Sequence, residues 1–127
     1  MSMRRTLAAL AAAAAVGTAA CDSGPSGPGT LVASVRGASL GGVVLEVTGA
    51  GIVGFEGLSS TQVYAAPVPR SESRHRVMLV HPDGGELRFE IQVQDVDMDD
   101  PVMVVVSAAG SDNETQLTSG IEVRLER

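Results

Sequence analysis

The chain has 127 residues, with nine Lys or Arg against fifteen Asp or Glu, and a formal net charge of −6 at pH 7. This acidic balance argues against nucleic acid as a partner, because neutralising phosphates requires a basic face. All nine cationic residues are arginine, which excludes a Schiff-base lysine, a P-loop lysine and a kinase-type lysine.

The first twenty residues predict an export signal. Arg4 and Arg5 form a short cationic start, and residues 7–20, mostly alanine, follow without a charge. The uncharged run is shorter than the ~20 apolar residues that a membrane-spanning helix needs. A charged start, an apolar stretch and small residues at its end are typical of a cleaved signal peptide. We therefore expect residues 1–20 to form a signal helix that is removed on export.

The signal ends in Thr18-Ala19-Ala20-Cys21, which resembles the lipobox of bacterial lipoproteins. Thr18 departs from the family pattern, which has Leu or another aliphatic residue there. The resemblance implies that Cys21 receives a diacylglycerol, that cleavage precedes it, and that the new amino group is acylated. The protein would then be anchored in a bacterial cell envelope, outside the cytoplasm, at the outer membrane or the periplasmic face of the inner membrane. The alternative is an ordinary secretory cleavage near Ala20, which leaves a free thiol.

Residues 21–29 comprise the cysteine and the stretch DSGPSGPG, whose Gly, Pro and Ser content is typical of a flexible tether. Residues 30–127 then provide about one domain's length of chain. Cys21 is the only cysteine, so no disulfide within the chain is available and aliphatic burial must hold the fold.

From Thr30 onward, short β-branched runs separated by Gly, Pro, Ser and Asp predict strands. Residues 52–58 and 61–66 are weaker candidates, and residues 102–106, apolar at every position, predict a central strand covered on both faces. Three strands alternate apolar with mostly polar residues, which indicates one buried face. Their inward residues are Leu31, Ala33 and Val35; Val43, Leu45 and Val47; and Ile121, Val123 and Leu125.

A β-hairpin is predicted between residues 75–80 and 86–94, around the turn Pro82-Asp83-Gly84-Gly85. In its second arm Phe89 falls on the apolar side and should join the core. No segment after the signal shows the 3.6-residue period of a helix. Seven to nine short strands at this spacing predict an all-β fold, a single antiparallel β-sandwich of Ig-like or cohesin-like type.

Three glycine-led strands, residues 41–49, 85–93 and 120–125, resemble those of cohesin-type and related carbohydrate-binding-type β-sandwiches of bacteria. The resemblance implies a Greek-key or jelly-roll sandwich that works by surface contact. The chain is shorter than a usual cohesin and lacks that family's Pro-Gly-Asp opening, so a dockerin partner is not implied. Sugar-binding sandwiches usually stack ligands on exposed aromatic rings, and only Tyr64 offers one here.

Residues 49–54 match the spacing G-x-G-x-x-G and follow a predicted strand. A dinucleotide site needs a helix next, whose N-terminus would hold the pyrophosphate. The chain continues instead as Phe55-Glu56-Gly57, with no helical pattern, which favours a turn between strands.

Asp95, Asp97, Asp99 and Asp100 form an acidic cluster after a predicted strand. Alternate carboxylates are the hard oxygen ligands that calcium uses. An EF-hand would need Gly and Glu where Asp100 and Val106 stand, so only a calcium site of another kind is compatible with the spacing. The favoured alternative is a solvated acidic loop.

The two histidines lie too far apart along one strand to share a metal there, at ~3.3 Å per residue. His75, between Arg74 and Arg76, favours a polar edge strand, and His81 a turn contact. No serine elbow or converging acid–base pair is visible.

The sequence thus predicts a lipid-anchored envelope β-sandwich that is not an enzyme. It would act as a structural or interaction module, with the membrane and an envelope protein or polysaccharide as partners. The alternative is a calcium-dependent adhesion or glycan-binding module.

Overall fold

The computed structural model describes residues 27–126, which form strands joined by turns. The predicted signal helix, Cys21 and most of the tether lie outside these residues. No helix within 27–126 has the length and apolar character to cross a membrane. The strands are β1 (Gly29–Arg36), β2 (Leu40–Thr48), β3 (Ile52–Leu58), β4 (Gln62–Pro67), β5 (Arg74–Val80), β6 (Leu87–Val93), β7 (Val102–Gly110), β8 (Thr115–Gln116) and β9 (Glu122–Glu126), with a 3-10 turn η1 (Thr118–Gly120) before β9.

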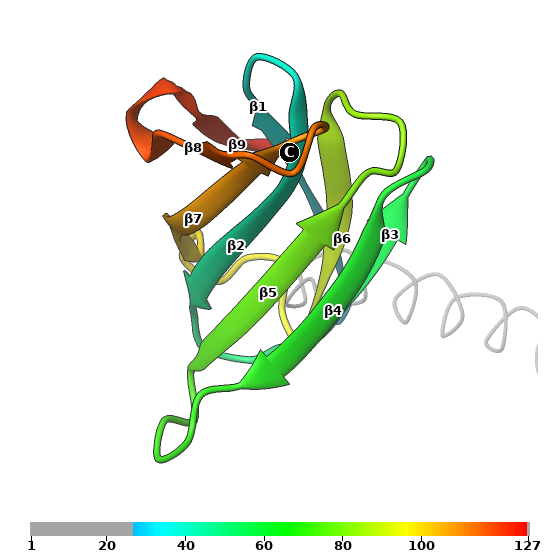
Figure 1. Ribbon diagram of the computed structural model, residues 1–127. Coiled ribbons are helices and arrows are strands. Elements are labelled where there is room, and N and C mark those ends of the chain that lie inside the picture. The colour runs from blue at the N-terminus through cyan, green and yellow to red at the C-terminus, as the bar shows by residue number, and fades with distance from the viewer. Residues whose placement is uncertain (1–26, 127) are drawn as a thin grey trace, which may run out of the picture.

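The strands form two antiparallel sheets, which confirms the predicted all-β fold. The four-stranded sheet has the order β3-β6-β1-β9, and the five-stranded sheet has the order β4-β5-β2-β7-β8. Figure 1 shows the two sheets as layers of a sandwich-like body, with β2 and β5 of one sheet in front of β1 and β6 of the other. The G-x-G-x-x-G segment, residues 49–54, is a turn that runs into β3. No helix follows it, which agrees with the expected turn between strands.

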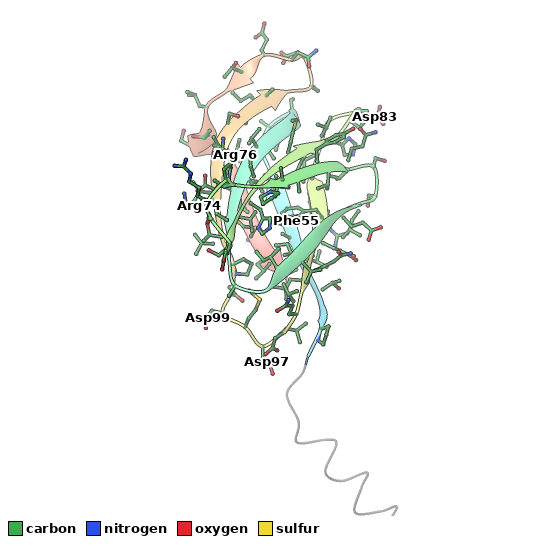
Figure 2. All side chains as sticks on the ribbon, turned by 90° about the horizontal axis from the view of Figure 1, so that it is seen from below. Phe55, Arg74, Arg76, Asp83, Asp97 and Asp99 are labelled. Carbon is green, nitrogen blue, oxygen red and sulfur yellow. The ribbon has the colours of Figure 1, made fainter. Side chains whose placement is uncertain are left out.

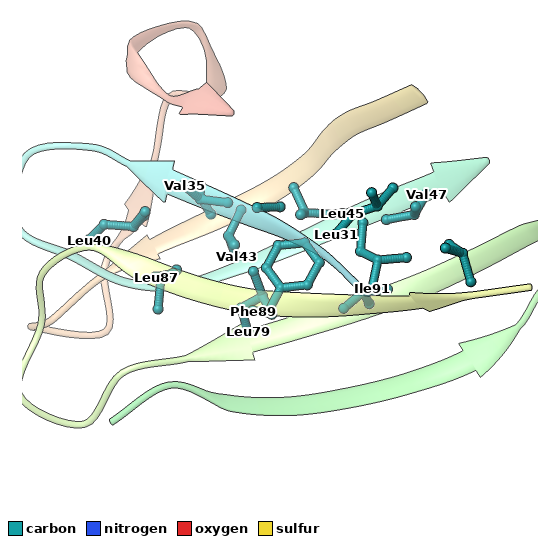
Figure 3. Packing of buried hydrophobic residues seen from close by; sticks show 14 residues of the cluster. Leu31, Val35, Leu40, Val43, Leu45, Val47, Leu79, Leu87, Phe89 and Ile91 are labelled. Atoms are coloured by element: carbon teal, nitrogen blue, oxygen red, sulfur yellow. The ribbon is translucent and has the colours of Figure 1, made fainter. Parts of the chain in front are cut away.

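The core lies between the sheets, where the inward residues of the alternating strands meet (Figure 3). Phe89 on β6 is fully buried there, together with Leu45 on β2 and Leu79 on β5. Alternation explains this, because successive strand residues point to opposite faces and only one face of each sheet is covered. The inward residues predicted for β1 and β2 are buried, and Ile121, Val123 and Leu125 pack against the core from the edge.

The predicted hairpin between residues 75–80 and 86–94 is wrong. Strand β5 belongs to the five-stranded sheet and β6 to the four-stranded sheet, so the turn carries the chain from one layer to the other. Gly84 and Gly85 have φ angles of 75° and 127°, as the turn signal required. Pro, Asp and Gly residues in a turn specify that the chain reverses its direction. The same reversal can join two neighbouring strands of one sheet, as in a hairpin, or two strands of different sheets, as here.

The prediction that residues 102–106 are covered on both faces is also wrong. Strand β7 contains them and lies next to the short edge strand β8. Met103 and Val105 pack toward the core, whereas Val102, Val104 and Val106 are exposed on the outer side. No third layer stacks on this side within residues 27–126, so the apolar run is covered on one face only.

The two ends of the body carry different loops. At the N-terminal end, the carbonyl of Gly27 accepts a hydrogen bond of 3.0 Å from the N–H of Val96, so loop 94–101 lies where the chain enters β1. At the opposite end, which we call the distal end, loops 37–39, 81–86 and 111–114 meet: Gly85 N–H donates to the Leu40 carbonyl (3.0 Å), and Ser111 N–H to that of Ser39 (2.8 Å).

Candidate functional site

The outer faces of the two sheets have opposite character. The four-stranded sheet presents charged side chains that pair across its surface. Arg36 Nε lies 2.8 Å from Glu86, and an Arg88 nitrogen lies 3.2 Å from Glu126. The five-stranded sheet presents mainly apolar side chains. Such a difference is unexpected for two surfaces that both face water, since soluble proteins rarely expose contiguous apolar patches of large size.

Most of the exposed apolar surface is gathered on that second sheet. Seven large hydrophobic side chains are exposed within residues 27–126; Val53 and Leu117 lie elsewhere, and the other five lie on the outer side of the five-stranded sheet. We call this surface, together with Val44 and Ala66, the apolar face. The five are Tyr64 (58% exposed), Met78 (45%), Val102 (62%), Val104 (56%) and Val106 (44%).

Strand register brings these side chains together from distant parts of the sequence. Met78 pairs with Tyr64 of β4 on one side and with Val44 of β2 on the other. In the next row, Glu46 lies directly opposite Val104 of β7. The register shift between Val44 and Leu45 leaves Val106 as the extra residue of β7. A bulge of this kind re-aims neighbouring side chains, and both Val106 and Ser107 are exposed.

A shallow, open groove runs over the apolar face. One part, about 480 Å³, is lined by Tyr64, Ala66 and Val106, among others. A second part, about 450 Å³, continues to the distal end between Val80, His81 and Asn113. Both parts share Met78, Val44 and Ser107, so they form one furrow. Each part is within the size range of ligand sites, ~300–1,000 Å³, but the furrow is open to solvent along its length.

Small residues hollow the distal part of this furrow. Its floor includes Gly41, Gly42, Ala109 and Gly110. A Cβ at Gly41 would lie 2.7 Å from the Gly110 carbonyl oxygen and 2.8 Å from the Ser111 Cα, so glycine is required where the 111–114 turn crosses β2. The hollow is therefore a consequence of how β2 and β7 meet at the distal end.

Charge on the apolar face is confined to one cluster. Glu46 forms ion pairs with both Arg74 and Arg76, with N–O distances of 3.2 Å each, and accepts a hydrogen bond from Arg76. All three side chains remain partly exposed, so these ion pairs add little stability. Because the carboxylate is already paired with two guanidinium groups, the face is suited to contact with apolar groups more than to recognition of a strongly charged ligand.

The predicted calcium ligands lie on loop 94–101, at the N-terminal end and away from the furrow. Asp95 Oδ1 accepts the backbone N–H of Asp97 at 2.9 Å, which is an Asx turn. Figure 2 shows Asp97 and Asp99 at the outer rim of the loop. Within residues 27–126, no three His, Cys, Asp or Glu side chains, Asp100 included, are grouped closely enough to hold a metal ion. The calcium site stays a sequence-based prediction.

Of the two histidines, only His75 differs from its predicted setting. Strand β5 lies between β4 and β2 and is not an edge, so the edge prediction for His75 is wrong. His75 shares the inward side with Val77 and Leu79 and packs on Phe55, with ring centroids 5.4 Å apart. His81 Nδ1 accepts the N–H of Asp83 at 3.3 Å, a turn contact as expected.

The apolar face was missed by sequence reasoning, although a signal for it exists. Residues 43–45, 77–80 and 102–106 are apolar at consecutive positions. In a two-layer fold each strand has one side toward water, so such runs place apolar side chains outside. Comparison of the chain with protein-family models, with curated proteins and with solved structures finds no match.

Proposed function

We propose that this protein is a lipid-anchored module of the bacterial cell envelope that binds a partner without catalysing a reaction. The observation that carries the proposal is the gathering of five exposed large hydrophobic side chains on one outer face. Large exposed apolar patches mark interaction sites because water contact with them is unfavourable. The apolar face is therefore the surface that meets the partner.

The anchor in this proposal is Cys21, carrying the lipid that its lipobox-like setting implies. Five residues lie between it and Gly27, and these six steps along the chain allow a reach of at most ~20 Å at ~3.3–3.6 Å per residue. The N-terminal end of the sandwich would then lie near the membrane. The distal end of the furrow would open away from the membrane, toward molecules of the envelope.

We propose an Ig-like or cohesin-like type for the sandwich, in keeping with its glycine-led strands. A protein partner fits the apolar face better than a polysaccharide does. Sugar recognition usually relies on several aromatic rings, and Tyr64 is the one aromatic side chain on this face. Methyl and thioether groups such as those of Val104 and Met78 pack well against the apolar side chains of a protein.

The anchor is tested by metabolic labelling with an alkyne fatty acid. The wild-type protein should take up the label, and Cys21→Ala should not. Absence of label on the wild type would refute the anchor while leaving the binding face untouched.

The binding face is tested by photo-crosslinking in cells. A photoreactive residue at Met78 should crosslink to one envelope component. The same residue at Glu90, on the outer side of the four-stranded sheet, should not. Equal crosslinking from both positions, or none from Met78, would contradict the proposed role of the apolar face.

A further inference from the structure

Strand β7 has a free backbone edge beside the apolar face. Strand β8 pairs only with Ala108 and Ala109 of β7, on the side away from β2. Within residues 27–126, no strand pairs with Val102–Ser107 on that side. In Figure 1 the first part of β7 lies at the margin of the five-stranded sheet, with no strand beyond it. An unpaired edge presents N–H and C=O groups that can accept another strand.

The free segment lacks two of the usual protections of an edge strand. Natural edges often carry charged residues or proline, which discourage pairing with another chain. Residues 102–106 have the sequence Val-Met-Val-Val-Val, with neither. β-branched residues also favour extended backbone. The segment is therefore well suited to adding a strand.

We propose that a second copy of this chain occupies this edge, through antiparallel pairing of the two β7 strands around a two-fold axis at Val104. In that register Val104 faces Val104 of the second copy. Val102 faces Val106, and Met103 faces Val105. Every pair joins two apolar side chains on the same side of the sheet, which is the kind of cross-strand contact that stabilises β-pairing. The contact is isologous, because both copies use the same surface, so the assembly stops at a dimer.

Charge favours a second copy in this antiparallel arrangement. Asp99 and Asp100 precede the free segment. Antiparallel pairing sends the carboxylates of the two copies to opposite ends of the joint. Parallel pairing would place like carboxylates side by side, which is unfavourable.

The length of the free edge also fits. In each copy, β8 pairs with β7 at Ala108 and Ala109. The β7 strand of the other copy must therefore leave the sheet before it reaches Ala108. Strand β7 starts at Val102, directly after Pro101, which lacks an N–H to donate. The two free segments thus match from end to end. Pairing joins the two five-stranded sheets and extends the apolar face across both copies, independently of the partner proposed above.

The test is the mass of the purified full-length chain in detergent, by analytical ultracentrifugation corrected for bound detergent. The wild type should be a dimer. Val104→Lys and Val104→Asp should each be monomeric, because like charges then meet at the axis. An equimolar mixture of the two should recover the dimer. Val53→Lys, at an equally exposed site on the other sheet, should stay dimeric. A monomeric wild type, or a mixture that stays monomeric, would overturn the proposal.

A cysteine scan fixes the register without relying on charged variants. Directly opposite residues of antiparallel strands have Cα atoms ~4.5–5.5 Å apart, within disulfide range. Val104→Cys should therefore form a disulfide-linked dimer on mild oxidation. Val102→Cys should not, because its two copies lie four residues apart along the strands, ~13 Å. Equal crosslinking of both variants would contradict a two-fold axis at Val104.

Discussion

His75 on β5 packs edge-on against Phe55 on β3, with ring centroids 5.4 Å apart and an angle of 66° between the rings. The contact joins the two sheets. The Nδ1 atom of His75 is buried and has no hydrogen-bond partner among residues 27–126. A buried polar atom without a partner costs about 1–3 kcal/mol.

Replacing His75 by leucine is therefore expected to stabilise the protein by about 1–3 kcal/mol, which raises Tm by several degrees in a domain of this size. Thermal unfolding followed by circular dichroism measures the change. His81→Leu is the control, because its Nδ1 already accepts the N–H of Asp83 and the substitution removes that contact. A lower Tm for His75→Leu than for wild type would show that the Nδ1 atom of His75 has a hydrogen-bond partner in the folded protein.

Phe89 is the largest fully buried side chain of the core. Truncation to alanine removes its packing and leaves a cavity, so we expect a loss of about 3–5 kcal/mol in the free energy of unfolding. Urea denaturation gives the value. Tyr64→Ala, on the exposed apolar face, should change stability by only about 0.5 kcal/mol or less. Similar losses for both would mean that Tyr64 is part of the core.

Gly41 lies under the turn that shapes the distal furrow. Its alanine variant would press a Cβ against the Gly110 carbonyl oxygen at 2.7 Å, so the turn must shift. We expect a destabilisation of about 1–3 kcal/mol, as for other overpacked sites. Gly120→Ala is the matched control, because its Cβ would meet nothing within 4 Å. Denaturant unfolding should show the loss at Gly41 alone.

Calcium is expected to leave thermal stability unchanged. The carboxylate of Asp95 is engaged in an Asx turn within loop 94–101. Within residues 27–126, no three His, Cys, Asp or Glu side chains are grouped closely enough to hold a metal ion. A ligand that binds the folded state raises Tm with its concentration. Melting curves in millimolar calcium and in chelator should therefore coincide. A clear rise with calcium would restore the adhesion alternative and direct attention to Asp97, Asp99 and Asp100.

Alternation in the sequence predicted part of the core. Leu45 and Phe89 point inward as expected, because strand geometry has a fixed two-residue period. Leu79 on β5 is also fully buried but was not predicted, since residues 77–80 are apolar at every position and do not alternate. Strand pairing was harder. The turn at Gly84 and Gly85 was predicted, yet β5 and β6 lie in different layers, because a turn signal does not specify which strand becomes the neighbour.

The candidate site was missed for a related reason. The run Val102–Val106 was expected inside a sheet covered on both faces, which is the usual environment of such a sequence. Its apolar character was judged correctly, but the predicted sandwich has two layers, and a two-layer fold leaves one face of each strand uncovered. Only the register that sets Met78 beside Tyr64 and Val44 shows that the apolar residues share one outer surface.

The most direct test of the proposed function compares how accessible the apolar face is in cells and in isolation. Tyr64→Cys and Val53→Cys each place a thiol at an exposed position, on different sheets. Both should react equally with a maleimide that does not cross membranes when the protein is purified. In the cell envelope, with the outer membrane permeabilised where there is one, we predict that Tyr64→Cys is protected and that Val53→Cys reacts as before. Equal reaction of the two thiols in cells would contradict the account, because the apolar face would then be uncovered where the protein works.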